Sequence, residues 1–188
     1  MRRVVFVLLG LAWLGTAAAA VEPPQQVVQR LVSVIRSFAP NGAAPNAEAA
    51  RAANALLDLP GVSQWALGPY WQERTPAEQQ EFVALLEQLF AKVAYPKSAE
   101  FFRDLEVEIA GERVRGERAV VSTRVRHPKE GLITIDYKLH QRNGSWQVYD
   151  ILLDDVSLAT NLRTQCLKII REHSYAELVR RMRDKLAE

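Results

Sequence analysis

The sequence has 188 residues, 48% of them hydrophobic and 24% charged, a composition that suits one globular domain with a sizeable core. Lysine and arginine number 24 against 22 aspartates and glutamates, a formal net charge of +2 with no basic stripe, so we expect no nucleic-acid partner. A single cysteine, Cys166, excludes an internal disulfide.

Residues 1–20 have the order of a secretory signal peptide. Two arginines precede an apolar run at Val4–Trp13, and a small-residue cleavage pattern follows at Ala18–Ala20. The run is shorter than the ~20 residues that span a bilayer, so we favour cleavage near Ala20 over a membrane anchor. The remaining 21–188 form one domain with 22 basic and 22 acidic residues, and therefore a formal charge near zero.

Four helical segments are predicted next, with a loop at 41–46 between the first two. Thr75-Pro76-Ala77-Glu78 gives the strongest signal, because it combines a capping box with proline at the first helical position. Apolar residues at helical spacing mark the others. The predicted helices run from Pro23 or Pro24 to Pro40, over 47–57, over 61–67, and from Thr75 to Pro96.

After residue 102 apolar residues occupy every second position, which is typical of strands. Asn143-Gly144 supplies a hairpin turn into the last strand. Four strands in series predict an antiparallel meander, and helices at 158–171 and 175–186 close the chain, the second opened by a capping box at Ser174–Glu177. The chain is therefore predicted as α+β, a curved four-stranded antiparallel sheet covered by N- and C-terminal helices, and periodicity leaves open whether the core is solid or hollow.

Signals for catalysis or metal binding are weak. Asp150 with Asp154 and Asp155 lacks the alternation and glycine of a calcium loop, so capping of the next helix by Asp155 or Ser157 explains these residues better. The three histidines have no metal-ligand spacing, and the sequence contains no glycine-rich phosphate loop. Cys166 is interpreted as a small buried hydrophobe. We expect no catalytic residue, no metal and no cofactor.

Three stretches of the chain combine aromatic, glycine and capping residues in a fixed order. They are Ala66–Trp71 with Thr75–Gln79, Asp136–Tyr137 with Gly144–Asp150, and Val156–Ser157 with Asn161–Gln165. Together they resemble the MlaC family, also called the toluene-tolerance auxiliary proteins, in its aromatic turn before a capped helix, its central hairpin and the entrance to its C-terminal helices. The chain departs from the family at Pro69, where a basic residue is common, and at Asp154–Asp155, where an acid–glycine pair is usual.

The resemblance implies a soluble periplasmic carrier of phospholipid that maintains outer-membrane lipid asymmetry. Family members carry phospholipid between an outer-membrane lipoprotein–porin complex and an inner-membrane ABC transporter with an MCE-domain ring. For this chain it implies a monomer whose single lipid-binding domain, 21–188, has an NTF2-like curved sheet and a hydrophobic cavity between sheet and helices. A hopanoid is the alternative cargo.

A lipid carrier must offer acyl chains an environment as free of water as the bilayer interior from which they are taken. Burying one methylene is worth ~0.8 kcal/mol, so a sixteen-carbon chain represents ~12 kcal/mol and requires a deep apolar cavity with the headgroup near solvent. Arg163 is the candidate for contact with a lipid phosphate or a partner, and a surface ion pair is its alternative role. The candidate lining residues, which ordinary core packing would also explain, are Trp65, Leu67, Phe82, Leu86, Phe90, Val107, Ile109, Val125, Ile133, Ile135, Tyr137, Val148 and Ile151.

Two other interpretations stay open. A small enzyme on a cavity-bearing sheet would place Asp136, Tyr137, His140 or Asp150 in its pocket, although strand alternation turns Asp136 and His140 away from Tyr137. A scaffold with a filled core is the third interpretation. The basic run at 180–185 is either a solvated face or a docking contact for anionic lipid heads.

Overall fold

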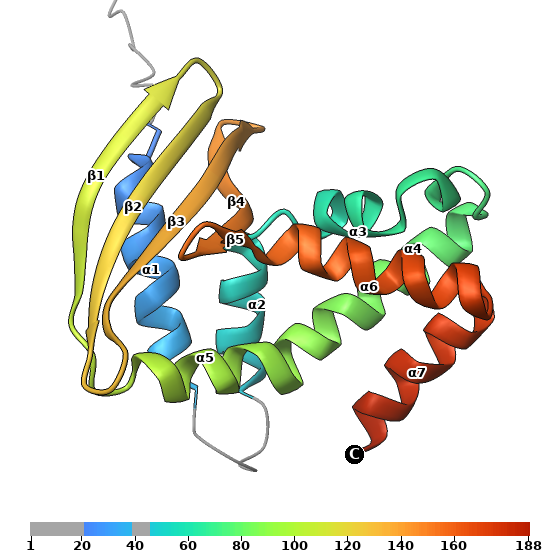
Figure 1. The fold of residues 1–188 in the computed structure, drawn as a ribbon. Helices are drawn as coiled ribbons and strands as arrows, with labels where there is room; N and C mark the ends of the chain where they lie inside the picture. The colour runs from blue at the N-terminus through green and yellow to red at the C-terminus, as the bar shows by residue number, and fades with distance from the viewer. Residues whose placement is uncertain (1–20, 39–45) are drawn as a thin grey trace, which may run out of the picture.

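The computed structural model describes residues 21–38 and 46–188, so the predicted signal peptide and residues 41–45 of the predicted loop lie outside the described residues. The fold is α+β, with an antiparallel sheet flanked by helices (Figure 1). The helices are α1 (Pro24–Arg36), α2 (Ala47–Leu56), α3 (Leu59–Leu67), α4 (Pro76–Leu89), α5 (Tyr95–Phe102), α6 (Leu158–Glu172) and α7 (Tyr175–Ala187). The strands are β1 (Val107–Arg115), β2 (Arg118–His127), β3 (Gly131–Arg142), β4 (Ser145–Leu153) and β5 (Val156–Ser157).

The sheet has five strands in the order β1-β2-β3-β4-β5, and the prediction of four is wrong by one. The additional strand, β5, has two residues and pairs with the end of β4. Two residues are too few to show an alternating pattern, which is why the sequence did not indicate it. Asp154 and Asp155 form the turn before β5 with φ angles of 44° and 65°, a left-handed backbone that is uncommon for residues other than glycine.

The inner face of the sheet builds the first of two cores. Alternate residues of β2 and β3, such as Val125 and Ile133, are buried against α1, α2 and α5. The predicted hairpin turn between β3 and β4 is confirmed, because Asn143 and Gly144 have the positive φ angles of 50° and 77° that such a two-residue turn needs.

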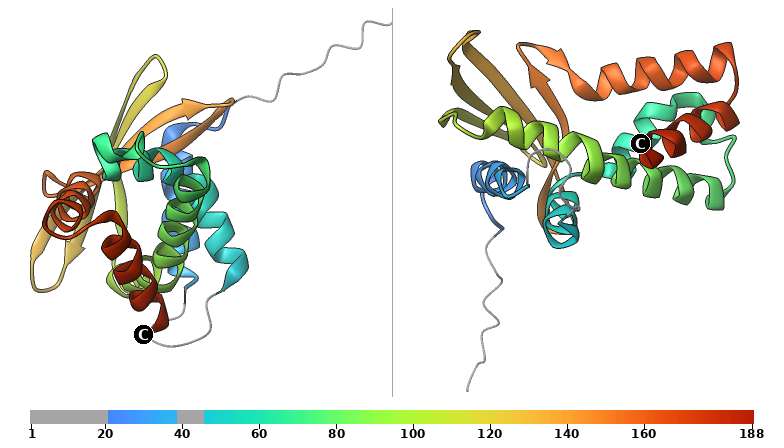
Figure 2. Two further views of the ribbon diagram at one scale, coloured as in Figure 1. Left: turned by 90° about the vertical axis from the view of Figure 1, so that its right-hand side faces the viewer. Right: turned by 90° about the horizontal axis from the view of Figure 1, so that it is seen from below.

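The second core lies among α3, α4, α6 and α7. It contains Leu67, Phe82, Leu86 and Cys166, all less than a tenth exposed. Cys166 is thus the buried hydrophobe that was predicted, and burial raises the pKa of its thiol to about 11, which keeps it protonated. Figure 2 shows the sheet and α1 on one side of the molecule, the α6–α7 hairpin on the other, and the α4–α5 segment running between them.

The helix that begins at Pro76 does not end at Pro96 as predicted, but continues to Phe102. A π-helical turn at Phe90–Ala94 joins α4 to α5, and Tyr95 donates its backbone N–H to the Phe90 carbonyl, five residues back. Proline lacks the N–H that an α-helical bond would require. Because Pro96 stands in the first turn of α5, directly after the widened turn, the chain continues as a helix.

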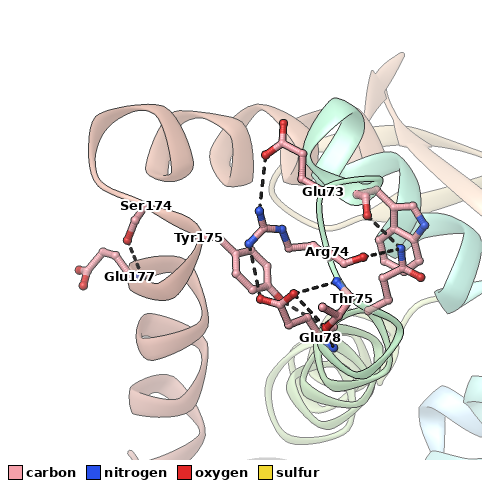
Figure 3. A network of polar contacts seen from close by, with 9 residues as sticks. Glu73, Arg74, Thr75, Glu78, Ser174, Tyr175 and Glu177 are labelled. Atoms are coloured by element: carbon pink, nitrogen blue, oxygen red, sulfur yellow. Dashed lines mark hydrogen bonds and ion pairs between the residues drawn. The ribbon is translucent and has the colours of Figure 1, made fainter.

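The two predicted capping boxes differ in the structure. At the start of α4, Glu78 donates its backbone N–H to Thr75 Oγ1 (3.3 Å), and Thr75 returns its own N–H to the Glu78 carboxylate (2.8 Å), so this box is confirmed (Figure 3). At the start of α7, Ser174 accepts from the Glu177 N–H, but the Glu177 carboxylate pairs with arginines of α7 instead. Only half of the second box forms.

The same region holds α4 and α7 together. The Arg74 guanidinium lies 4.7 Å from the centre of the Tyr175 ring, and the Tyr175 hydroxyl donates to the Glu78 carbonyl (3.1 Å; Figure 3). These contacts fix the helical end of the molecule next to the second core. Across 21–38 and 46–188, no helix has both the length and the hydropathy to cross a bilayer.

Candidate functional site

An apolar cavity of about 340 Å³ lies between α1, α5 and the inner face of the sheet. Nearly all of its wall is aliphatic or aromatic, and Lys97 and Ser98 of α5 are the polar exceptions beside two tyrosines. The other lining residues are Leu31, Val32, Ile35, Leu57, Phe90, Ala94, Tyr95, Phe101, Phe102, Ile135, Tyr137, Ile151, Leu153 and Leu158. Such a wall suits hydrocarbon and offers little to a polar ligand.

A smaller apolar cavity of about 170 Å³ adjoins the first, between α3, β4 and the start of α6. Four residues line both cavities, so their side chains form a shared wall: Leu57, Phe90, Ile151 and Leu158. The two volumes are therefore neighbouring parts of one apolar region inside the fold.

The π-turn places the aromatic residues of this wall. It leaves the Phe90 ring edge-on to Tyr95, with ring centres 5.8 Å apart, and Tyr95 also contacts Phe38 at 5.2 Å. The Tyr95 hydroxyl donates to Asn54 Oδ1 (2.5 Å), so its polar atom is satisfied on the side of α2. The π-turn, which the sequence did not predict, thus positions two aromatic residues of the cavity wall.

Both tyrosines of the wall are held in the neutral form. Burial raises the pKa of Tyr95 far above its usual value, and the nearby Glu87 carboxylate raises it further. Burial also raises the pKa of Tyr137, although a hydrogen bond with Thr123 lowers it in part. At neutral pH the aromatic lining therefore carries no charge.

The groups that an enzyme would need do not gather in this cavity. Tyr137 lines it, whereas His140 and Asp150 line a neighbouring polar pocket, and His140 lies on the opposite strand phase from Tyr137, as strand alternation predicts. Within the described parts of the chain, no three histidine, cysteine, aspartate or glutamate residues form a group that could hold a metal ion. Ser157 is the residue that caps α6, by accepting from the Thr160 N–H.

The polar pocket has a volume of about 630 Å³ and lies between α3, α6 and the ends of β2, β3 and β4. Trp65 and Arg163 lie there rather than in the apolar region, and Trp65 is 51% exposed. The Arg163 guanidinium stacks on the Trp65 ring at 4.5 Å and donates to the Trp65 carbonyl. Arg163 therefore lies in a pocket wall rather than in a simple surface ion pair.

Five of the thirteen predicted lining residues line the two apolar cavities. Four line the larger cavity, namely Phe90, Ile135, Tyr137 and Ile151, and Val148 lines the smaller one. The other eight lie elsewhere: Leu67, Phe82 and Leu86 in the second core, Val125 and Ile133 in the first core, Val107 and Ile109 in a groove beside α1, and Trp65 at the polar pocket.

Sequence reasoning missed the helical side of the larger cavity. Leu31, Val32 and Ile35 of α1 and the Phe101-Phe102 pair of α5 all line it. The apolar face of the first helix was visible as a signal, since these residues recur at helical spacing. Nothing in that spacing indicates which part of the sheet the helix covers.

The model of the MlaC protein family matches residues 25–184. The chain belongs to the MlaC family. A solved structure with a similar fold is the phospholipid-binding protein from Ralstonia solanacearum in complex with a phospholipid. It is 20% identical to this MlaC chain, the match covers 87% of this chain and 94% of that one, and the TM-score is 0.68. At this identity the likeness shows a shared fold, and the family resemblance predicted from the sequence is confirmed.

Proposed function

We propose that this MlaC protein is a periplasmic lipid carrier that holds phospholipid acyl chains in its apolar cavity. It would shuttle lipid, as a monomer, between an outer-membrane lipoprotein–porin complex and an inner-membrane MCE-domain ABC transporter. The observation that carries this proposal is the apolar region between sheet and helices, whose largely aliphatic and aromatic walls suit hydrocarbon. The phospholipid bound to the similar Ralstonia protein supports the same cargo class.

The dimensions support the proposal. Ligand pockets commonly measure ~300–1,000 Å³, and the larger cavity alone falls within that range. Each methylene transferred from water gains ~0.8 kcal/mol, so an acyl chain needs continuous apolar contact to leave a bilayer at little net cost. Phe90, Ile135, Tyr137, Val148 and Ile151 are the predicted residues that we propose touch the acyl chains.

We further propose that the protein binds and does not catalyse, with an NTF2-like sheet as the wall of its cavity and no cofactor. The acid–base candidates Asp136 and His140 are on strand positions that alternate with Tyr137, which separates them from the cavity. A hopanoid would also suit an apolar cavity. The test must therefore identify the cargo as well as detect it.

Native mass spectrometry of the protein purified from its own periplasm, with lipid extraction of the same sample, tests the carrier function. We expect a stoichiometric adduct with the mass of a phospholipid. Ala94→Trp, which places an indole in the larger cavity, should lose that adduct. Ala110→Trp, at an exposed position of β1, should keep it and serves as the matched control.

A hopanoid adduct would replace phospholipid as the cargo and leave the carrier function intact. A clean apo mass, together with no uptake from labelled phospholipid vesicles, would contradict the proposal. In that case the enzyme and scaffold interpretations would become the leading ones.

A further inference from the structure

The polar pocket on the outer side of the sheet is rich in cationic side chains. Five basic groups and two carboxylates line it, along with Trp65, Gly68 and other residues of α3 and α6. The basic groups are Arg118, Lys138, His140, Arg142 and Arg163, and the carboxylates are Asp58 and Asp150. The balance is positive even when His140 is neutral.

Asp58 is already fully engaged within the protein. It is 3% exposed, its Oδ1 accepts the Gly61 N–H at 3.0 Å, and its Oδ2 lies 3.0 Å from His140 Nε2. Arg142 approaches the same carboxylate at 3.6 Å. This carboxylate therefore neutralises one arginine of the pocket and caps α3.

Asp150 is engaged in the same way. Its oxygens accept from the Ser157 hydroxyl (2.9 Å) and the Ala159 N–H (3.2 Å), and Lys138 Nζ lies 3.4 Å away. In the described residues, Arg118 and Arg163 have no carboxylate within ion-pair distance. These two arginines are the uncompensated charges of the pocket.

Arg163 is held in place before any ligand arrives. Its guanidinium is packed between the Trp65 ring and Gly68, so closely that a Cβ on Gly68 would lie 2.6 Å from Nη1. One Nη1 N–H is given to the Trp65 carbonyl, and a guanidinium has five N–H donors. A fixed guanidinium with donors to spare loses little conformational entropy when it binds a phosphate oxygen.

The polar pocket adjoins the apolar region. Val62, Tyr149, Asp150 and Ala159 line both this pocket and the smaller apolar cavity, and that cavity shares its opposite wall with the larger one. Polar pocket, smaller cavity and larger cavity thus follow one another through the fold. This order matches a lipid, whose charged headgroup is joined to a hydrocarbon chain.

We propose that the pocket around Arg118 and Arg163 binds the phosphate of the carried lipid, with an acyl chain passing beside Tyr149 into the apolar cavities. This proposal rests on the proposed carrier function and adds the place in the fold where the headgroup phosphate binds. Arg163 supplies oriented N–H donors, and Arg118 supplies a second positive charge, whereas Lys138 and Arg142 are already paired with Asp150 and Asp58. A free phosphate ion has the same chemistry, so the test must separate the two sources.

The experiment compares delipidated wild-type protein with the double variant Arg118→Gln/Arg163→Gln. Each is titrated calorimetrically with short-chain phosphatidylglycerol, with diacylglycerol of the same chains, and with glycerophosphate. The wild type should bind phosphatidylglycerol most tightly, and the double variant should lose about tenfold or more of that affinity, because charge-assisted hydrogen bonds are removed. Its affinity for diacylglycerol, which lacks the phosphate, should stay unchanged.

Arg124→Gln is the matched control, because Arg124 is an exposed arginine of β2 that does not line the pocket. It should bind all three compounds as the wild type does. The affinity of the wild type for phosphatidylglycerol should also fall as salt rises, while that for diacylglycerol should not.

Each other outcome overturns a defined claim. Equal losses for phosphatidylglycerol and diacylglycerol, or no loss for either, would overturn the headgroup site while the carrier function stands. Glycerophosphate bound as tightly as phosphatidylglycerol would make the pocket a site for free phosphate compounds and overturn the lipid link. Wild-type protein that binds neither lipid would instead contradict the carrier function itself.

Discussion

Gly68 has a backbone conformation that other residues rarely adopt, and the Arg163 guanidinium lies where a side chain at this position would begin. Its φ angle is 53°, and a Cβ would come within 2.6–2.8 Å of three atoms of the Arg163 guanidinium. Gly116 has a similar φ of 57°, but open space surrounds its missing Cβ. Both glycines have a positive φ, but only at Gly68 would an added Cβ meet another side chain.

Gly68→Ala should lower the free energy of unfolding by more than Gly116→Ala does. Positive φ alone costs ~1–3 kcal/mol in a non-glycine residue, and only at Gly68 does the displacement of Arg163 add to it. Urea denaturation of both variants measures the difference. Fluorescence of Trp65 should shift in Gly68→Ala alone, and equal stability losses without that shift would contradict the contact.

The buried tyrosines should make stability depend on alkaline pH. Burial raises the pKa of Tyr95 and Tyr137, so above pH ~10 the unfolded chain releases these phenolic protons while the folded protein retains them. Stability is therefore at its full value below pH ~10 and falls above it, by up to ~1.4 kcal/mol per pH unit for each tyrosine.

Tyr137→Phe should reduce the loss of stability above pH ~10 by the contribution of one tyrosine. Urea midpoints of the wild type and this variant between pH 8 and pH 11 provide the measurement. Parallel pH profiles for the two proteins would show that Tyr137 ionises as readily in the folded state as in the unfolded one.

The starts of α4 and α7 give a comparison at the scale of elements. Thr75 and Ser174 both accept the N–H of the residue three positions on, but only Glu78 returns a bond to the backbone of its cap residue. Thr75→Ala should cost ~1–2 kcal/mol of stability and Ser174→Ala less, since the second removes a single bond. Urea denaturation measures both, and Thr75→Ser should retain most of the stability. A larger loss from Ser174→Ala would contradict the assignment of the complete box to α4.

Local signals predicted the elements well where the determining residues lie close in sequence. The capped start at Thr75 and the Asn143-Gly144 turn are such cases, because the bonds involved span only a few residues. The helix end at Pro96 was mispredicted, since the π-turn that precedes proline packs Tyr95 against Phe38, a residue distant in sequence. The strand β5 was not predicted from the sequence, because its pairing with β4 depends on the turn at Asp154–Asp155.

At the scale of the whole molecule, composition and order of elements predicted the α+β class but not the wall of the site. Ile133 and Ile135 have the same chemistry and the same phase on β3, and both are buried in the first core, yet only Ile135 also lines the cavity. What distinguishes them is the place where α1 and α5 cross the sheet. That crossing is set by packing between distant segments and leaves no signal in either strand.

The apolar region also predicts how stability and cargo are coupled. A bound acyl chain would add contacts to its walls, so the delipidated protein should gain ~2.7 kcal/mol when lipid is present at one hundred times its dissociation constant. Ala94→Trp should stabilise the delipidated protein by filling part of this space and should lose the response to lipid. Ala110→Trp should do neither. Thermal unfolding of the three proteins with and without phospholipid decides the matter, since a lipid-dependent shift that persists in Ala94→Trp would place the cargo outside the cavity.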